Sequence, residues 1–462
     1  MKYNHSVVWL RRDLRLHDHT ALAHALINSR SVSLIFIFDP AIIKNLPSND
    51  RRLSLIWESL EDMDTRLRSS GSAAIHKFHA RPETLLPDLL RTLNIDALFF
   101  NHDYEPAAMY RDNSVKRLCN EIGVQVQSFK DQVIFEKDDV LKDDRTPYKV
   151  FTAYKNKWLT EFKNFPPDAS RSQAIDTSKI VSLKTNIPQV SKLQDVGFYT
   201  QQNFINGGES EAKKIWKQYS ASFLNDYDRF RDLPGADHTS HLSPYLRFGN
   251  ISVRQLINDL SNYNSNGAKT FLSELIWREF FMMILYHFPH VEHQSFNKQF
   301  DKVRWLNNEQ WFTAWCAGRT GFPIVDAGMR QLNETGWMHN RVRMITASFL
   351  VKHLHVDWRW GEKYFAEKLL DYELSSNNGN WQWAAGTGVD AAPYFRIFNP
   401  ITQSKKFDPD GVYIRRWVPE LKELPAKLIH TPSGINHYPP PMIELDKERK
   451  VCLDLYNIRN TD

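Results

Sequence analysis

Cysteine is scarce in this sequence. Cys119, Cys316 and Cys452 are the only cysteines among 462 residues, and they lie far apart without CxxC spacing. An odd and scattered set argues against a disulfide framework and against a structural zinc site. We therefore expect a protein of the reducing cytoplasm that binds no metal.

Long hydrophobic runs are also missing. No apolar run approaches the roughly 18 residues that a membrane span needs, and the first residues, MKYNHSVVWLRRDLR, lack the pattern of a signal peptide. The net charge of +5 permits an anionic partner without requiring one. Because 462 residues exceed the usual limit of one hydrophobic core, the sequence predicts two domains.

Aromatic residues, in contrast, are plentiful. The chain has 14 Trp, 17 Tyr and 28 Phe, with most of the tryptophans beyond residue 270. The first part of the chain has short β-rich runs at 6–10, 33–38, 73–78, 97–101 and 124–129, separated by helical patterns. This alternation predicts βαβ units and a doubly wound parallel sheet. No GxGxxG or GxxxxGK[ST] motif follows these runs, so the usual phosphate-binding loops are absent.

The periodicity changes after residue 208. Residues 165–208 are polar and rich in Pro, Ser, Asn and Gln, which is typical of a long connection. Beyond them, helical periodicity dominates at 271–288, 328–337 and 340–354. The second half is therefore expected to be mostly helical.

Two helical faces in this half place polar groups on apolar helices. Glu274, Trp277 and Arg278 fall at i, i+3 and i+4, so one helix face presents all three. The alternative is an internal Glu274–Arg278 ion pair. Asn340 and Met344 are likewise one turn apart, and an amide beside a thioether suits a flat heterocycle with imide edges. The alternative makes Asn340 a helix cap and Met344 core filling.

Three further stretches invite a functional interpretation. TSHLS (239–243) offers hydroxyls and backbone N–H groups for a pyrophosphate, although an ordinary helix N-cap explains it equally well. NNGNWQWAAGTGVDAAPYFRIFNP (377–400) sets Trp381 and Trp383 among small residues, as in a wall that a flat ligand approaches or in a glycine-rich core turn. His287, His290 and His293 suggest metal by spacing, but Pro289 interrupts the helix, so a solvated loop is expected.

Taken together, these motifs resemble one family over nearly the whole chain. The resemblance begins with VVWLRRDLRLHDHTAL (7–22), continues through YKVFTAYKNKW (148–158) and TSHLSPYLRFG (239–249), and is densest in SELIWREFF, GRTGFPIVDAGMRQL, TGWMHNRVRMITASFLVKHL and the 377–400 stretch. The sequence is similar to the photolyase/cryptochrome flavoproteins, and within them to bacterial class I cyclobutane pyrimidine dimer photolyases.

The resemblance implies an α/β, Rossmann-like antenna domain over residues 1–133, a linker over 134–207 and an all-helical FAD-binding domain over 208–462. The small residues of 379–392 would let the helical domain close around the flavin. Asn377 matches the residue facing flavin N5, where photolyases carry Asn, plant cryptochromes Asp and animal cryptochromes Cys. The residues implied to contact the FAD are Tyr227, Thr239, Ser240, His241, Leu242, Ser243, Arg343, Asp371, Tyr372, Glu373 and Asn377; position 241 varies in the family.

The implied activity is light-driven repair of UV-damaged DNA by a monomer. An electron from excited, reduced FAD would split a cyclobutane dimer and then return to the flavin. Glu274 and Asn340 would bind the base edges and Met344 would pack at the dimer. The other implied groups are the cavity walls Trp277 and Trp383, the DNA-contacting Arg231, Arg278, Arg341 and Arg396, and the electron-transfer chain Trp381, Trp358 and Trp305.

The second, antenna chromophore is less defined. Folate-binding members carry an Asn-Glu pair where this chain has Ala107 and Ala108. We therefore expect weak binding of methenyltetrahydrofolate, or a different chromophore such as a deazaflavin. Two other functions remain open: a cryptochrome-type photoreceptor, and a nucleotide-binding module with a DNA-binding helical half.

Overall fold

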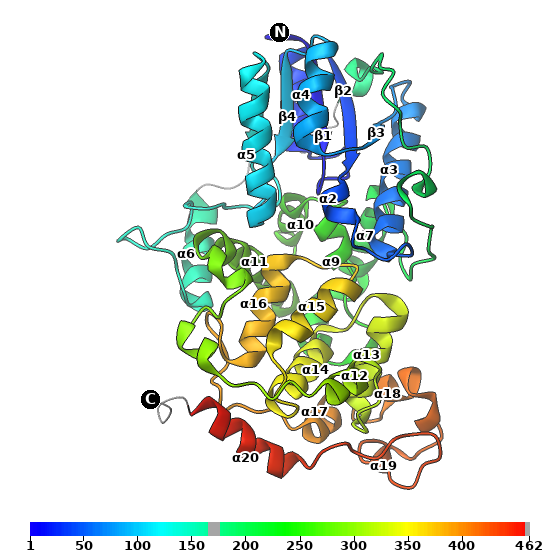
Figure 1. Cartoon of the computed structure of the whole chain (residues 1–462), viewed down its shortest axis with the longest axis vertical. Helices are drawn as coiled ribbons and strands as arrows, with labels where there is room; N and C mark the ends of the chain where they lie inside the picture. The colour runs from blue at the N-terminus through cyan, green and yellow to red at the C-terminus, as the bar shows by residue number, and fades with distance from the viewer. Residues whose placement is uncertain (165–175, 458–462) are drawn as a thin grey trace. The chain divides into compact units, whose positions relative to one another are not determined.

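The computed structural model describes residues 1–164 and 176–457 and divides into two compact units (Figure 1). Unit 1 comprises residues 1–140, 156–222 and 240–264, and unit 2 comprises residues 141–155, 223–239 and 265–462. Residues 165–175 of the expected linker and the last five residues of the expected FAD-binding domain lie outside the described residues. Each unit has its own hydrophobic core.

Unit 1 contains a five-stranded parallel sheet in the order β3-β2-β1-β4-β5, which confirms the predicted doubly wound sheet. Its central strands are apolar on both faces, as parallel strands covered by helices must be. The strands are β1 (Tyr3–Leu10), β2 (Ser29–Phe38), β3 (His76–His79), β4 (Ala97–Asn101) and β5 (Gln125–Phe129). The helices are α1 (Thr20–Asn28), α2 (Pro40–Ile43), α3 (Arg51–Ser69), α4 (Pro82–Thr92), α5 (Pro106–Glu121), α7 (Glu209–Ser222), α9 (Ser243–Phe248) and α10 (Val253–Leu260).

Two hydrophobic layers enclose this sheet. Val8 and Leu10 of β1 pack with residues of α1 and α3, whereas Val7 and Trp9 pack with residues of α4 and α5. Successive side chains of a strand point to opposite faces, so one strand serves both layers. The sheet is thus the middle layer of a three-layer unit.

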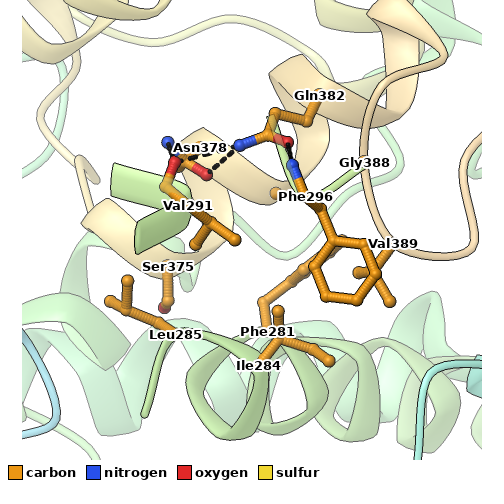
Figure 2. A pocket seen from close by; sticks show the side chains of 11 residues that line it. Phe281, Ile284, Leu285, Val291, Phe296, Ser375, Asn378, Gln382, Gly388 and Val389 are labelled. Atoms are coloured by element: carbon orange, nitrogen blue, oxygen red, sulfur yellow. Dashed lines mark hydrogen bonds between the residues drawn. The ribbon is translucent and has the colours of Figure 1, made fainter. Parts of the chain in front are cut away.

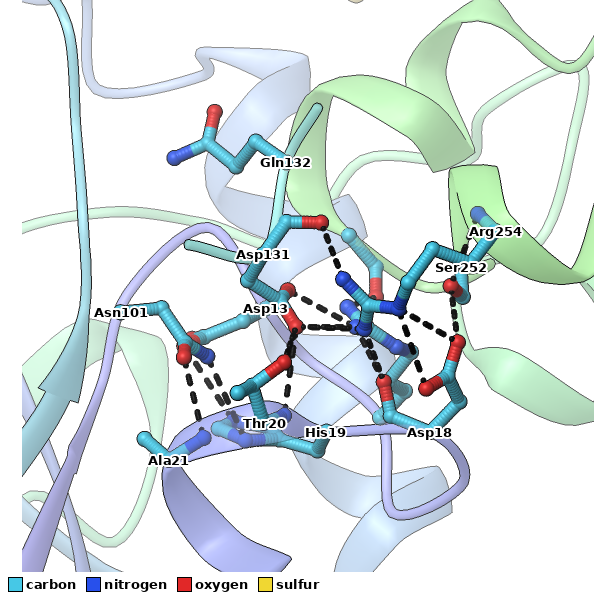
Figure 3. Close-up of polar contacts among 12 residues, drawn as sticks. Asp13, Asp18, His19, Thr20, Ala21, Asn101, Asp131, Gln132, Ser252 and Arg254 are labelled. Carbon is cyan, nitrogen blue, oxygen red and sulfur yellow. Dashed lines mark hydrogen bonds and ion pairs between the residues drawn. The ribbon is translucent and has the colours of Figure 1, made fainter. Parts of the chain in front are cut away.

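A buried polar network fastens α10 to the end of the sheet (Figure 3). Arg254 of α10 and Arg15 both donate to the Asp131 carboxylate at 2.8 Å, and Arg254 also bonds to Asp18 at 3.1 Å. Burial would raise the pKa of Asp131, but the two guanidinium groups outweigh burial and hold that pKa well below its ordinary value. This network explains why α9 and α10 belong to the unit that contains the sheet.

Unit 2 is built from helices, and its core gathers around α13, α14 and α16. The predicted helical segments are confirmed with shifted ends. The helices are α8 (Tyr227–Phe230), α11 (Asn266–His287), α12 (Glu309–Cys316), α13 (Pro323–Thr335), α14 (Asn340–Lys352), α15 (Trp358–Lys368), α16 (Leu374–Ala385), α17 (Pro400–Phe407), α18 (Val412–Trp417), α19 (Ala426–Ile429) and α20 (Leu445–Tyr456). Helix α6 (Phe151–Asn164) begins in unit 2 and ends in unit 1.

Local sequence sets the ends of the helices that matter for the site. The Ser265 side chain caps α11 by accepting from the Ala268 backbone N–H at 3.1 Å, and Pro289 follows its end. Helix α16 ends at Gly386, which adopts the left-handed conformation with φ +77°. No described helix is both long and apolar enough to cross a membrane.

Candidate functional site

The polar face of α11 carries the first part of the site. Glu274 accepts a hydrogen bond from Arg231 Nη1 at 2.6 Å, and Arg278 Nε lies 3.4 Å from the Glu373 carboxylate. Trp277 stacks on Phe151 with ring centroids 3.6 Å apart. Helical spacing offered Arg278 as a partner of Glu274, but Glu274 forms its ion pair with Arg231, 43 positions away in the sequence.

The start of α14 carries the second part. Asn340 Nδ2 lies 4.0 Å from Met344 Sδ, so the predicted pair shares one helix face. The helix cap is His339, whose Nδ1 accepts from the Arg341 backbone N–H at 3.2 Å. The alternative that made Asn340 the cap is therefore wrong by one residue. Asn340 is exposed and Met344 half-buried, so neither is a core position.

Two arginines of α14 have carboxylate partners. Arg341 Nε and Nη2 both donate to Asp232 Oδ1, at 3.2 and 2.8 Å. Arg343 binds Asp371 through Nη1 and Nη2, at 3.1 and 2.8 Å, and its Nε donates to the Met338 carbonyl. The predicted Arg343–Asp371 pairing is thus present as a two-pronged ion pair.

The Asn377 amide has a fixed orientation. Its Nδ2 donates to the Glu362 carbonyl at 3.0 Å and to Glu362 Oε1 at 2.8 Å. Among the described residues, no donor bonds to its Oδ1. Burial raises the pKa of Glu362, the Asn377 bond opposes this shift, and nearby Glu292 adds to it. Asn377 therefore presents a neutral acceptor, as the side chain expected beside a flavin N5–H should.

The TSHLS loop fits an anion better than it fits a helix cap. The cap residue of α9 is Leu242, whose side chain makes no capping bond, so the N-cap interpretation is wrong. His241 has φ +51° and is followed by Leu242 in the right-handed region, a pair of conformations that turns successive N–H groups toward one anion. In unit 2, Thr239 Oγ1 is buried without a hydrogen-bond partner among the described residues.

The remaining residues expected to contact the FAD lie partly in unit 2 and partly in unit 1. In unit 2, the Tyr227 ring packs edge-on against Phe271, and burial, with the Glu274 charge, raises the pKa of Tyr227 well above its ordinary value. Asp371 and Glu373 are buried and Tyr372 packs against the unit 2 core. In unit 1, Ser240 Oγ accepts from the Leu242 backbone N–H at 3.4 Å, and Ser243 begins α9.

The small residues near Trp381 serve helix packing. A Cβ on Gly379 would lie 2.2 Å from the Phe281 ring, and a Cβ on Gly361 would lie 2.1 Å from the Trp381 ring. Residues 377–385 of the stretch therefore belong to a close-packed helix, α16, which ends at Gly386. Behind it, Asn378 and Gln382 bond to each other and to the backbone around a cavity of about 10 Å³, which is too small for any cofactor (Figure 2).

The three tryptophans expected to carry electrons lie in one core. Trp381 and Trp358 are buried, and Trp305 packs partly buried against the same cluster, as does Trp383. Trp381 contacts Trp315 and Phe365 edge-on, with centroids 6.1 and 5.0 Å away, and Trp305 contacts Tyr456 edge-on at 5.7 Å.

Some predicted residues stand apart from these groups. The Arg396 side chain is exposed, and within the described residues it forms no ion pair. No group of three or more His, Cys, Asp or Glu side chains that could hold a metal occurs in the described ranges. Ala108 is buried in the first turns of α5. Asp232 and Glu362 were not predicted, because neither belongs to a recognisable motif and their partners lie 109 and 15 positions away in the sequence.

Comparison with known proteins identifies the family. A DNA photolyase model matches residues 6–173 and a model of the FAD binding domain of DNA photolyase matches residues 271–458. The deoxyribodipyrimidine photo-lyases of Vibrio cholerae and Escherichia coli are each 38% identical to the chain over 97% of its length and 98% of theirs.

Solved structures give the same result. A bacterial class III photolyase from Agrobacterium tumefaciens superposes with a TM-score of 0.90 at 34% identity, covering 100% of this chain and 99% of its own. The archaeal photolyase from Sulfolobus tokodaii with two FAD molecules gives 0.82 at 33% identity, over 99% and 100%. A Synechocystis cryptochrome gives 0.87 at 27% identity, over 98% and 100%. The resemblance seen in the sequence motifs is confirmed: the chain belongs to the DNA photolyase family and contains its FAD-binding domain.

Proposed function

We propose that this protein is a deoxyribodipyrimidine photo-lyase that splits cyclobutane pyrimidine dimers in UV-damaged DNA under light. The observation that carries the proposal is the pair of polar faces on α11 and α14: Glu274 supplies a hydrogen-bonding group on α11, and Asn340 supplies one beside Met344 on α14. FAD, when bound, supplies the photochemical electron; the protein supplies binding, orientation and electrostatics.

The chain's own residues hold the cofactor in this proposal. The backbone N–H groups around the His241–Leu242 turn bind the diphosphate, because this pair of backbone conformations directs successive N–H groups toward one anion. Asn377 offers a neutral acceptor to the N5–H of reduced flavin. An amide adds no charge there and donates no proton of its own, so it favours the reduced form that repair requires.

Substrate recognition follows from the same residue types. A fused pyrimidine pair stacks and pairs poorly, so extruding it from the duplex costs less than extruding sound bases; photolyases are a standard example of such base flipping. Asn340 donates to a base carbonyl and accepts from an imide N–H, and Glu274 accepts from an imide N–H. Trp277 and Trp383 form the apolar walls. Arg231, Arg278, Arg341 and Arg396 bind phosphates, which fixes register without reading sequence.

The remaining assignments belong to the same proposal. Light harvesting lies in residues 1–133 and catalysis in residues 208–462, joined by a linker over 134–207. Because Ala108 provides no carboxylate for a pterin, we propose a deazaflavin, or folate bound weakly, as the second chromophore. The protein acts as a cytoplasmic monomer on chromosomal DNA.

A cryptochrome-type photoreceptor is the second candidate, because a cryptochrome superposes with a TM-score of 0.87. Both candidates predict bound flavin, but only repair requires Glu274 on α11 and the Asn340–Met344 face on α14. The chemistry of these residues therefore favours the enzyme.

One assay separates the candidates. Reduced protein is incubated with UV-damaged oligothymidylate under blue light or in the dark, and restored thymines are quantified by chromatography. We expect restoration only in the light, and none on a (6-4) photoproduct. A flavin-loaded protein that leaves dimers intact under light would refute the enzyme and favour the photoreceptor.

A further inference from the structure

We infer that Asp232 is a positioning residue for DNA binding: it holds Arg341 so that one edge of its guanidinium group faces the DNA backbone. The inference rests on the proposed function, which makes Arg341 a phosphate contact. Nothing in the sequence motifs or the comparisons assigns a role to Asp232, which follows Arg231 just beyond α8.

The hydrogen bonds show which edge of Arg341 is occupied. Nε and Nη2 donate to the same oxygen, Asp232 Oδ1, at 3.2 and 2.8 Å. Among the described residues, Nη1 donates to no acceptor, and Nη2 has a second hydrogen to donate. The Nη1 and Nη2 edge is therefore available, and two parallel N–H groups are the arrangement that binds phosphate in a bidentate manner.

A second contact fixes the plane of the group. The Arg341 guanidinium carbon lies 4.4 Å from the centroid of the Phe407 ring, and Phe407 is buried in the unit 2 core. Asp232 thus fixes which edge of the Arg341 guanidinium group is occupied, and Phe407 fixes the plane of that group. A long arginine side chain that is ordered beforehand loses less conformational freedom when it binds.

Arg343, two residues along α14, provides the contrast. All three of its guanidinium nitrogens are used, Nε by the Met338 carbonyl and both Nη atoms by Asp371. Arg343 therefore has no free edge of this kind and serves to hold its own unit together. Both arginines are paired with an aspartate. They differ in whether an edge of N–H donors remains unused.

Solvent exposure agrees with a role in binding. The Asp232 side chain is 38% exposed, against 18% for Arg341 and 22% for Arg231, whose Nε lies 4.0 Å from Asp232. An ion pair this exposed contributes little to folding stability. Asp232 lies beside two of the proposed phosphate contacts, where its orienting effect acts on binding.

The test compares two variants of equal charge. Asp232→Asn keeps an acceptor oxygen for Arg341 and Asp232→Ala does not, so their difference reports orientation, while the charge change is common to both. The dissociation constant for a duplex carrying one thymine dimer, and for the same undamaged duplex, is measured in the dark on FAD-loaded protein. We expect Asp232→Ala to bind both duplexes about 2- to 12-fold more weakly than Asp232→Asn, the cost of ordering one long side chain.

Two controls make the result specific. Asp228, an exposed residue of α8, gives the same charge changes, and its Ala and Asn variants are expected to bind alike. In an Arg341→Gln background the two Asp232 variants are also expected to bind alike, and the salt dependence of binding should fall by about 0.9 in the log–log slope, as for one lost phosphate contact.

Equal affinities for Asp232→Ala and Asp232→Asn in otherwise unchanged protein would overturn the inference, as would a difference that persists without Arg341. Both variants are checked for FAD content and unfolding temperature, so that misfolding is recognised. Failure of the proposed function has a separate signature, which is unchanged protein that binds DNA but does not split dimers under light.

Discussion

Each unit contains a cluster in which arginines meet aspartates, and the two clusters differ in burial and in unused donors. In unit 1, Arg15 and Asp131 are 3% and 1% exposed, and every guanidinium nitrogen of Arg15 has an acceptor. In unit 2, Arg341 and Asp232 are 18% and 38% exposed, and Arg341 keeps an open edge. The same chemical pair stabilises the fold where it is buried and fully bonded, and is available for binding where it is not.

The largest expected effect tests the buried cluster. Asp131→Ala leaves Arg15 and Arg254 without their shared carboxylate inside unit 1 and should lower the free energy of unfolding by about 3–5 kcal/mol. Chemical denaturation of FAD-loaded protein measures this loss. The comparison would break if the exposed control, Asp232→Ala, destabilised the protein as much; we expect that control to cost less than about 1 kcal/mol.

The next prediction concerns the open cluster. Glu274→Ala removes a group proposed to bind the dimer's base edges, and a lost hydrogen bond to a charged group costs about 1.5–3 kcal/mol, or roughly 10- to 160-fold in repair. Dimer splitting per absorbed photon and the flavin content are measured together. We expect flavin to be retained while repair falls. An unaffected repair yield would remove Glu274 from the site.

Lowering the pH tests the buried cluster of unit 1. The pKa of Asp131 is depressed in the folded protein, so its contribution to stability is present above the ordinary aspartate value of 3.8 and is lost as pH falls below it. The gap in unfolding free energy between unchanged protein and Asp131→Asn should therefore narrow by about 1.4 kcal/mol per pH unit below roughly pH 4. A gap that is constant from pH 6 to pH 3 would contradict this assignment.

Substitution of Trp381 should have the smallest effect on repair. This side chain is as buried as the unit 1 network, but we propose that it carries electrons. Trp381→Phe should block photoreduction of resting FAD and leave repair nearly unchanged once the flavin is reduced chemically. Photoreduction is measured by flavin absorbance under illumination. Repair is measured as dimer splitting by dithionite-reduced protein. Normal photoreduction in the variant would make Trp381 a packing residue.

Much of the fold was predictable, because its signals are local. β-Rich runs marked the strands within a few residues, and three helices appeared where periodicity placed them. The Asn340–Met344 face was predictable because helical spacing alone brings those residues together.

What escaped prediction depends on tertiary contacts. Asp131 and Arg254 are 123 positions apart, and Glu274 and Arg231 are 43 apart, so no local pattern links them. The helix cap at His339 was missed because a ring nitrogen replaced the usual Ser, Thr, Asp or Asn oxygen. Sequence alone left open whether the small residues near Trp381 face a ligand or pack in the core. At Gly379 an added Cβ would lie 2.2 Å from the Phe281 ring, a contact between helices that no local pattern shows.

For protein engineering, Gly361 reverses a familiar rule. A glycine inside a helix such as α15 is an obvious site for alanine, a change that usually stabilises by about 0.5–1 kcal/mol. Here the added methyl carbon would lie 2.1 Å from the indole of Trp381. A stabilisation programme guided by helix propensity would therefore push aside the first ring of the proposed electron path, and would select against photoreduction without touching the flavin or the DNA.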